Sequence, residues 1–427
     1  MSSLDVQKAR EHFPSLKSGF LFGENAGGSQ ISQEVIDRLT DYLVNTNVQL
    51  GATYHASKVS TSRVFDEAPR LAVKLFNARS PDEIIFGSSS TLNLENLARG
   101  LEADISPGDE FIVTGEHEAN VGPWKKLALR TGAVVKYWKA TPTDESNPYS
   151  VSLKKEDLLP LISDRTRIVA FTACSNILGS IVPVKDFVQA IRQDSMTKGA
   201  KKVEISVDCV AYAPHRLIDV QDWDVDFAVL SYYKVYGPHI SALYVRDSVL
   251  KNSVSSIVHH FIDVDKAPSY KLQPGGPGYE ITYATTGVVP YLLSLSPANN
   301  LRASFDAIAR HEQELVQPLL TFLTDKAQWE RGVRVVGDST THLNRVPTIS
   351  FVVIGSKPLK SQEVVNVFDE SGTIGIRCGN CYAYTLLKDL TPGFDVDDGV
   401  VRISLVHYNT VEEVARIIDL LKAVLAV

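Results

Sequence analysis

The 427-residue chain has little cysteine and no excess of basic residues. Its four cysteines are too few and too scattered for a disulfide framework. The lone C-x-x-C pair, Cys378 and Cys381, lacks the second pair of ligands that a structural zinc ion requires, so we expect no metal. With 43 basic and 50 acidic residues the net charge is −7, which argues against nucleic acid or an anionic membrane as a partner.

Long hydrophobic runs are also missing. No stretch approaches the roughly 18 apolar residues of a membrane-spanning helix. The N-terminal segment is polar and amphipathic and has no apolar core of the kind found in signal peptides, so we expect a cytoplasmic location. Hydrophobic residues make up 44% of the chain and charged residues 22%, which predicts a soluble enzyme with a sizeable core. The length predicts two or three domains.

The middle of the chain alternates short apolar strands with helical patterns. This alternation predicts an α/β fold with a mostly parallel seven-stranded sheet that is covered by helices on both faces. The predicted helices cover residues 92–103, 121–131 and 184–197. The predicted strands are Ile84–Phe86, Phe111–Thr114, Val134–Trp138, Arg167–Ala173, Val203–Val207, Phe227–Leu230 and Ser241–Val245.

The last third of the chain has the pattern of a smaller α+β domain. A helical pattern over 301–325 precedes predicted strands at 333–336, 348–354, 373–377 and 401–406 and a final amphipathic helix over Val411–Leu425. The Pro- and Gly-rich segment Lys266–Gly278 predicts a loop. We therefore expect three parts: an N-terminal segment that contributes to the active site and the small domain, a large domain, and a small C-terminal domain. Their predicted ranges are 1–49, 50–290 and 291–427.

Lys234 is the most informative residue of the sequence. It follows the apolar strand Phe227–Leu230 and precedes a Gly–Pro break, and Asp208 directly follows the strand Val203–Val207. A lysine and a carboxylate at the carboxyl ends of two buried parallel strands suit an enzyme that holds pyridoxal 5'-phosphate (PLP). The lysine forms a Schiff base with the cofactor, and the aspartate keeps the pyridine nitrogen protonated. The alternative is a surface lysine after a strand.

Polar residues follow three other predicted strands at the edge of the sheet where ligands gather. The segment Gly87–Thr91 offers hydroxyls and backbone N–H groups at a helix N-terminus, which suits a phosphate. His117 is placed to stack on a flat cofactor ring, and Asn176 is placed to donate to a ring hydroxyl. Each also has an ordinary alternative: a helix cap, a surface histidine and a turn residue.

Several motifs, in this order, resemble the class V aminotransferase family of fold-type I PLP enzymes, in its cysteine-desulfurase-like branch. The resemblance covers nearly the whole length. It implies the PLP-dependent transferase fold, PLP as cofactor, a small amino acid as substrate, and a homodimer with active sites near the interface. The motifs are Asn25–Ser29, Ser89–Thr91, Glu116–Asn120, Ser175–Gly179, Val207–Asp208, Ser231–Pro238 and Val401–Thr410.

The resemblance implies a role for each residue that matches a cofactor motif. Lys234 is expected to be the Schiff-base lysine, and His117 to stack over the ring and relay protons. Asp208 is expected to pair with the pyridinium nitrogen, and Asn176 to bind the ring hydroxyl. The residues expected to hold the phosphate are Ser90, Thr91 and Ser231.

The same resemblance implies the substrate contacts. Arg402 is expected to take the α-carboxylate, because its fork of donors matches a planar anion. Asn25, Arg377 and Cys381 are expected beside it. A substrate with a second, β-carboxylate needs another cation, and the sequence does not choose among five candidates. These are Arg377, His55, Lys58, His259 and His260.

One departure from the family pattern concerns the nucleophilic cysteine. Similar desulfurases carry Arg-x-Gly-x-His-Cys-Ala, and here the stretch from Arg377 to Ala383 reads Arg-Cys-Gly-Asn-Cys-Tyr-Ala. Tyr382 therefore takes the nucleophile's place, and Cys381 comes one residue early. Together with further replacements, this resembles a divergent subgroup that includes the decarboxylative aldolase of fungal ustiloxin biosynthesis. The further replacements are Ala211, Tyr233 and Tyr283, where the family has Gln, His and Thr.

Three functions remain open from the sequence. The first is a PLP-dependent lyase or aldolase for decarboxylative aldol addition, in which L-aspartate loses its β-carboxylate and the resulting enamine attacks an aldehyde. It needs no thiolate, so the displaced cysteine favours it. The second is a cysteine desulfurase or selenocysteine lyase that uses Cys381 after a loop shift. The third is a non-catalytic partner protein of the same fold, against which the intact set of Lys234, Asp208 and His117 argues.

Overall fold

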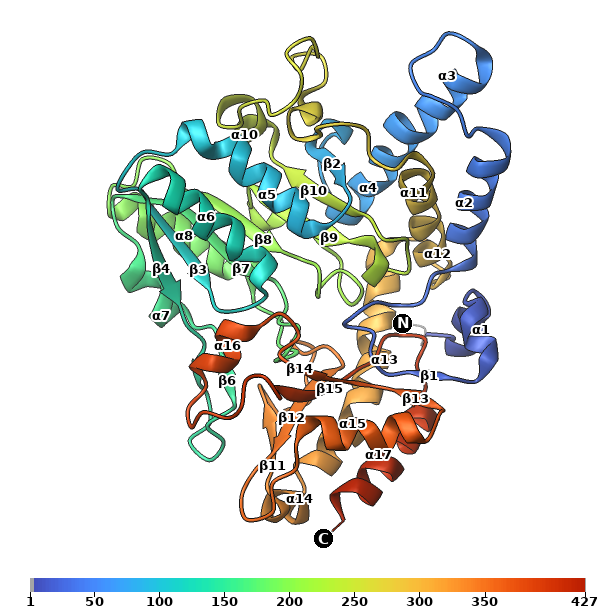
Figure 1. Cartoon of the computed structure of the whole chain (residues 1–427), viewed down its shortest axis with the longest axis vertical. Helices are drawn as coiled ribbons and strands as arrows, with labels where there is room; N and C mark the ends of the chain where they lie inside the picture. Colours follow the sequence, from blue (N-terminus) through green and yellow to red (C-terminus); the bar gives the residue numbers. More distant parts are fainter. Residues whose placement is uncertain (1–3, 427) are drawn as a thin grey trace.

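The computed structural model describes residues 4–426 of the chain. Figure 1 shows a large upper part that contains the main sheet and a smaller lower part that contains a second sheet. The long helix α13 (Leu301–Leu323) runs between the two parts, and the N-terminal segment lies at their junction. This arrangement places the carboxyl ends of the main strands opposite the second sheet.

The main sheet has seven strands in the order β2-β10-β9-β8-β7-β3-β4. Only β10 runs antiparallel to its neighbours, β9 and β2, and the remaining pairs are parallel. The prediction of a mostly parallel seven-stranded sheet is confirmed. The strands are β2 (Ile84–Gly87), β3 (Glu110–Thr114), β4 (Val134–Trp138), β7 (Thr166–Thr172), β8 (Glu204–Asp208), β9 (Phe227–Ser231) and β10 (Ser241–Val245).

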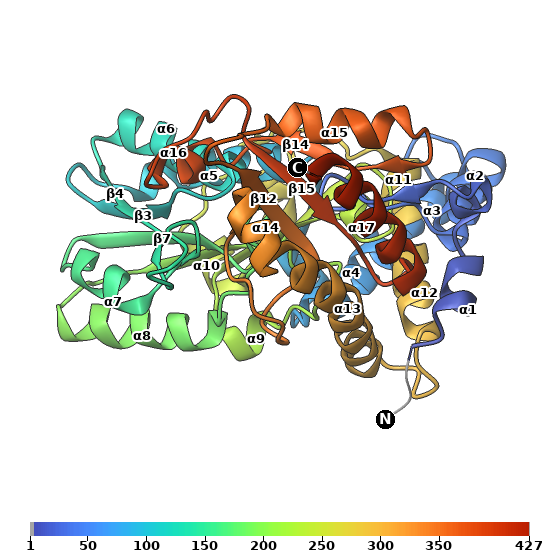
Figure 2. The same cartoon turned by 90° about the horizontal axis from the view of Figure 1, so that it is seen from below.

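Helices cover both faces of this sheet. Figure 2 shows α5 (Ser90–Leu101) and α6 (Gly122–Thr131) on one face and α8 (Val184–Thr197) on the other. Side chains alternate along a strand, so β9 contributes to both cores. Phe227 and Val229 lie in one buried cluster, and Ala228 and Leu230 lie in the other. Burial on both faces explains why the inner strands read as continuous apolar runs, whereas the edge strand β4 is largely exposed or half-buried.

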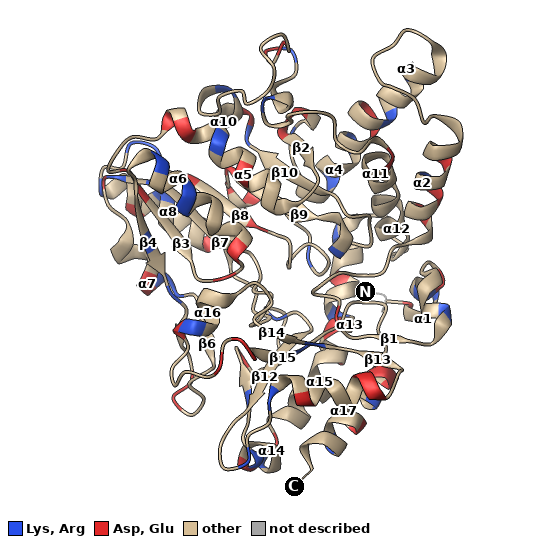
Figure 3. Ribbon diagram, viewed as in Figure 1, with Lys and Arg blue, Asp and Glu red and all other residues tan. Residues whose placement is uncertain are grey.

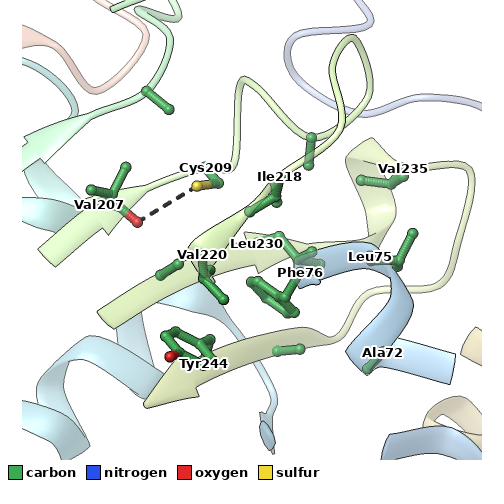
Figure 4. Close-up of a cluster of buried hydrophobic side chains, with 14 of the residues drawn as sticks. Ala72, Leu75, Phe76, Val207, Cys209, Ile218, Val220, Leu230, Val235 and Tyr244 are labelled. Carbon is green, nitrogen blue, oxygen red and sulfur yellow. Dashed lines mark hydrogen bonds between the residues drawn. The ribbon is translucent and has the colours of Figure 1, made fainter. Parts of the chain in front are cut away.

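The core on the α8 face also includes α4 (Ala68–Phe76). Figure 4 shows Phe76 of α4 next to Leu230 of β9 and Tyr244 of β10, and the rings of Phe76 and Tyr244 lie 6.3 Å apart. The thiol of Cys209 packs in the same cluster, with its Sγ 3.8 Å from the carbonyl oxygen of Val207. Burial raises the pKa of the Cys209 thiol, which makes this cysteine a packing residue.

The second sheet has four antiparallel strands in the order β11-β12-β15-β14. The predicted single strand over 373–377 is wrong. Ile374–Gly375 (β13) instead pairs with Leu21–Phe22 (β1) of the N-terminal segment, and the chain then crosses to the other sheet at β14. The bounds are β11 (Val333–Val336), β12 (Thr348–Val353), β14 (Arg377–Gly379) and β15 (Val400–Ser404), with helices α15 (Ser361–Glu370) and α17 (Val411–Leu425) packed beside them.

The helix α13 links the two parts of the molecule. The first half of α13 contributes Phe305 and Ile308 to the core of the large sheet, and its second half packs in the core of the small sheet.

The predicted loop 266–278 is also partly wrong, because Pro268–Leu272 forms a turn of 3-10 helix, and the fixed φ of proline suits the first position of such a turn. The predicted domain boundaries at residues 50 and 291 stay predictions.

The surface carries both signs of charge. Figure 3 shows acidic and basic segments interspersed along the outer helices. Within residues 4–426, no helix combines the length and apolar character needed to cross a membrane.

An aromatic cluster anchors the N-terminal segment to the rest of the fold. Phe13 is fully buried, and its ring lies 5.2 Å from that of Tyr291, 4.7 Å from that of Tyr408 and 5.7 Å from that of Tyr236. These rings come from α12 (Val288–Ser294), the C-terminal domain and the segment just after Lys234. The cluster therefore fixes the backbone next to Lys234.

We expect Phe13→Ala to destabilise the protein by about 3–5 kcal/mol, because the substitution leaves a cavity among rings that cannot collapse into it. Thermal unfolding of the variant and the parent checks this. Phe261→Ala is the matched control, because Phe261 is 74% exposed and should unfold with the parent. Equal midpoints for the two variants would contradict an anchoring role for Phe13.

Candidate active site

A cavity of about 460 Å³ lies beyond the carboxyl ends of the main strands. The small sheet and the N-terminal segment form its other side, through Arg402, Arg377 and Gly27. A smaller inner chamber of about 60 Å³ adjoins it and reaches Asp208 at the end of β8. Because Lys234 lines both spaces, the two form one site at the edge of the sheet where such folds bind ligands.

Lys234 and Asp208 meet in the inner chamber, and both side chains are 5% exposed. Burial, reinforced by the charge of Arg402, lowers the pKa of Lys234 to about 8, although Asp208 and Glu24 oppose the shift. Burial raises the pKa of Asp208, while a hydrogen bond from the Val210 N–H (2.9 Å) and the charge of Lys234 act in the other direction. The lysine is therefore more easily deprotonated than a surface lysine.

His117 lies on the wall shared by the two spaces. Its Nδ1 accepts the backbone N–H of Ala119 (3.2 Å), which assigns the ring proton to Nε2. Burial, with the charges of Lys234 and Arg402, lowers the pKa of His117 to about 3. The ring is thus neutral at physiological pH and offers a flat face and one exchangeable proton.

Hydroxyl groups gather at the N-terminus of α5. The Oγ of Ser90 lies 2.7 Å from the Oγ of Ser231 and 2.8 Å from that of Ser241. Thr91, Ser90 and Ser231 all line the inner chamber, as predicted for a phosphate site. Ser89 caps the helix by accepting the Leu92 N–H at 3.1 Å. Hydroxyls at the positive end of a helix of this length suit a phosphate.

Asn176 carries an unused acceptor. Its Nδ2 donates to the carbonyl oxygen of Cys381 (2.9 Å), and its buried Oδ1 has no hydrogen-bond partner among residues 4–426. A buried oxygen without a donor costs free energy, so a ligand that donates a hydrogen bond there stabilises the site. The prediction had Asn176 donating to a ring hydroxyl, whereas the atom left for a ligand is the acceptor.

Arg402 is nearly inaccessible, with 2% of its side chain exposed. Its Nη1 donates to the backbone oxygen of Asn176 (3.1 Å) and its Nη2 to the Oε1 of Glu24 (2.7 Å). The same carboxylate oxygen lies 3.6 Å from the Nη1 of Arg377, whose side chain is 45% exposed. Two guanidinium groups therefore face the cavity, and one carboxylate of the chain lies between them.

The cysteine loop makes a sharp turn after β14. Cys381 (φ 48°) and Tyr382 (φ 63°) both adopt the left-handed conformation, which is strained for residues other than glycine. As a result their side chains diverge. Cys381 is 6% exposed and packs in an apolar cluster with Ile177 and Leu386, whereas Tyr382 is 65% exposed, with its ring 5.6 Å from that of His117.

Some predicted contacts do not reach the cavity. Asn25 is 2% exposed, and its Nδ2 donates to the carbonyl oxygens of Phe22 (2.7 Å) and Ser404 (2.9 Å) while its Oδ1 accepts from the hydroxyl of Tyr408. It therefore ties the N-terminal segment to β15 instead of facing the substrate. Among the five candidates for a second cation, only Arg377 lines the cavity of this chain. His55, Lys58, His259 and His260 lie on α3 (His55–Ser62) and on the loop around Phe261.

Two carboxylates were missed by the sequence analysis. Glu24 holds Arg402, and the buried Glu116 accepts a hydrogen bond from the Oγ of Ser175 (2.7 Å). Burial, together with the charge of Asp208, raises the pKa of Glu116 to about 7. Each directly precedes a motif residue, Asn25 or His117, and that adjacency was the signal available in the sequence.

We expect the amine of Lys234 to react as a neutral nucleophile at lower pH than an ordinary lysine, because its pKa is about 8. Acetic anhydride labelling of the cofactor-free protein over a pH series, read by mass spectrometry of the Lys234 peptide, measures this. Exposed Lys326 reports reagent reactivity in the same samples. Asp208→Asn should move the midpoint further down, since Asp208 stabilises the charged amine. A midpoint above pH 10 would show that burial does not act on this amine.

Comparisons with known proteins agree with this site. Residues 21–417 match the family model described as aminotransferase class-V. The chain is 42% identical to the aminotransferase-like protein FGM3 of Gibberella zeae over 99% of both proteins. It is 31% identical to the cysteine desulfurase-like protein ustD of Aspergillus flavus, over 96% of this chain and 88% of that one. An apo cysteine desulfurase from Thermococcus onnurineus NA1 shares the fold, with a TM-score of 0.82 over 99% and 98% of the chains and 21% identity.

The residues of the cavity fit PLP. Lys234, whose pKa is lowered, shares the inner chamber with the buried carboxylate of Asp208, and the neutral imidazole of His117 forms one wall. Hydroxyl groups lie at the N-terminus of α5, and the Asn176 Oδ1 has no hydrogen-bond donor among residues 4–426. The predictions of family, fold type, cofactor and enzyme are confirmed, and the individual role of each residue stays a prediction. The chain belongs to the class V aminotransferase family and is a PLP-dependent enzyme.

Proposed function

We propose that this enzyme removes the β-carboxylate of a small acidic amino acid, with L-aspartate as the best candidate, and adds the resulting carbon nucleophile to an aldehyde. The Cβ–carboxylate bond breaks, carbon dioxide leaves, and the electron pair forms a bond to the aldehyde carbon, whose oxygen takes up a proton. The observation that carries the proposal is the cysteine loop: the exposed Tyr382 stands at the nucleophile's position in the family pattern, and Cys381 is buried against apolar residues.

The residues around the cofactor site supply proton transfer and charge. PLP supplies an electron-accepting ring. Asp208, at the end of β8, would hold a proton on the ring nitrogen, and Lys234, with a pKa of about 8, would take a proton from Cα near neutral pH. His117 presents a neutral ring whose Nε2 can give and regain a proton.

Two guanidinium groups suit a substrate with two carboxylates. Arg402 is buried and held in place, which suits orientation of the α-carboxylate. Arg377 lines the same cavity, and its nearest carboxylate, Glu24, is 3.6 Å away, beyond hydrogen-bond distance. Its donors are therefore available to a β-carboxylate. Loss of carbon dioxide moves negative charge away from the β-carboxylate, so a cation beside it does not favour the bond cleavage. We therefore assign Arg377 to substrate binding and orientation.

A second candidate function, cysteine desulfuration, is favoured by one observation. Cys381 lines the same cavity as Lys234 and Arg377, although its Sγ lies 3.7 Å from the carbonyl oxygen of Gly379 and its neighbours are apolar. A rearrangement of the strained turn at Cys381 and Tyr382 would be needed to present the thiol.

Cys381→Ala separates the two candidates. We expect the variant to release carbon dioxide from L-aspartate at a rate within about fivefold of the parent, equivalent to roughly 1 kcal/mol, because no step of decarboxylation uses the thiol. Headspace carbon dioxide from L-aspartate and sulfide from L-cysteine are measured side by side. Sulfide release that the parent shows and the variant loses by about 10³-fold would establish desulfuration instead.

Arg377→Gln tests the second carboxylate site. We expect the KM for L-aspartate to rise by about 10- to 100-fold, because a charge-assisted contact to one carboxylate is lost. Steady-state carbon dioxide release measures it. Arg334→Gln is the matched control: its guanidinium lies 3.4 Å from the Trp329 ring on the small sheet, outside the cavity. An unchanged KM in Arg377→Gln would remove this residue from substrate binding.

A further inference from the structure

Glu24 forms an ion pair with Arg402, the residue assigned to the α-carboxylate of the substrate. It sits beside β15, in a parallel bridge with Ser404, two residues beyond Arg402. Its Oε1 accepts from the Nη2 of Arg402 at 2.7 Å, and Glu24 is close enough to influence the charge of Lys234. A carboxylate of the chain thus holds a buried cation in the wall of the cavity.

The contact between Glu24 and Arg402 is incomplete. A carboxylate binds a guanidinium best through two parallel hydrogen bonds. The Nη1 of Arg402 donates to the backbone oxygen of Asn176, and Nε and Nη2 form a two-donor edge of the guanidinium. Glu24 uses only Nη2, and the buried Nε has no partner among residues 4–426. A free carboxylate placed on this edge would satisfy both donors.

The fold offers Glu24 a second position. Its side chain is 31% exposed and also lines a neighbouring cavity of about 430 Å³, together with Phe22, Gln30 and Arg377. Its present position depends on Gly27, because a Cβ there would lie 2.1 Å from Oε2. The Glu24 carboxylate therefore lies close to the backbone of Gly27 on one side and borders the neighbouring cavity on the other.

We propose that Glu24 is a resident carboxylate, which occupies Arg402 in the ligand-free enzyme and is displaced by the carboxylate of the incoming amino acid. Binding is then an exchange of one carboxylate for another on a guanidinium that stays paired throughout. Glu24 acts as a specificity-determining residue: it weakens the binding of every amine that carries a carboxylate and leaves amines without one unaffected. The inference rests on the part of the proposed function that assigns the α-carboxylate to Arg402.

The test compares L-alanine with ethylamine, which differ only in the carboxylate. We expect Glu24→Gln in the PLP-loaded enzyme to bind L-alanine about tenfold more tightly, the change associated with one charge-assisted hydrogen bond, and to bind ethylamine as the parent does. Titration of the cofactor's visible absorption gives both dissociation constants. Glu24→Ala should shift them in the same direction, which guards against an effect peculiar to glutamine.

The matched control is Glu413→Gln. Glu413 pairs with Arg10 at 3.0 Å and so also joins the N-terminal segment to the C-terminal domain, but outside the cavity. It should leave both dissociation constants unchanged. Unchanged or weaker L-alanine binding in both Glu24 variants overturns the proposal, and so does equal tightening of both ligands, which would mean an effect through the Lys234 amine.

One further variant separates this inference from the proposed function. If Arg402→Gln weakens L-alanine binding while the Glu24 variants do not tighten it, the carboxylate assignment survives and the displacement is wrong. If Arg402→Gln leaves L-alanine binding unchanged, the assignment of Arg402 in the proposed function fails. L-Alanine has no β-carboxylate, so neither result depends on whether the enzyme decarboxylates.

Discussion

Arg402 is the point at which three separate parts of the chain meet. The guanidinium extends from β15 of the small sheet, donates to the Asn176 turn of the large domain, and holds Glu24 of the N-terminal segment. A buried charge needs hydrogen-bonding and charged partners, so each contact constrains the position of the part that supplies it. Three parts of the chain that meet at the cavity are thus joined by one cation.

The charge of the same guanidinium also contributes to the pKa shifts of Lys234 and His117. Burial is the larger cause in each case, but the charge of Arg402 lowers the pKa of both Lys234 and His117. An amine and an imidazole that are easily kept neutral are what proton transfer near neutral pH requires. The Glu24 carboxylate paired with Arg402 partly cancels that effect, because its charge raises the pKa of Lys234.

The parts that the sequence predicted are those governed by local pattern. The inner strands are buried and apolar on both faces, so their pattern was found, and the residues at their ends, such as Lys234 and Asp208, converge because parallel strands share an edge. The parts it could not predict depend on contacts between distant segments. Asn25 is turned away by bonds to Phe22, Ser404 and Tyr408, and β13 pairs with the N-terminal segment instead of continuing into β14. Glu24 was overlooked because only the fold places it beside an arginine 378 residues away.

The cysteine loop shows how one residue position can redirect a site. In a strand, successive side chains point to opposite faces. Here Cys381 and Tyr382 are two successive left-handed residues that make a turn, and their side chains lie in different surroundings. Cys381 packs against an apolar cluster while also lining the cavity, and Tyr382 lines the cavity as an exposed side chain. Because strain in such a turn persists only where surrounding contacts hold it, the bonds from Asn176 to the Cys381 oxygen (2.9 Å) and from the Glu118 N–H to the Tyr382 oxygen (2.8 Å) maintain this orientation. These two contacts of the loop backbone thereby keep the Tyr382 ring at the cavity, 5.6 Å from the ring of His117.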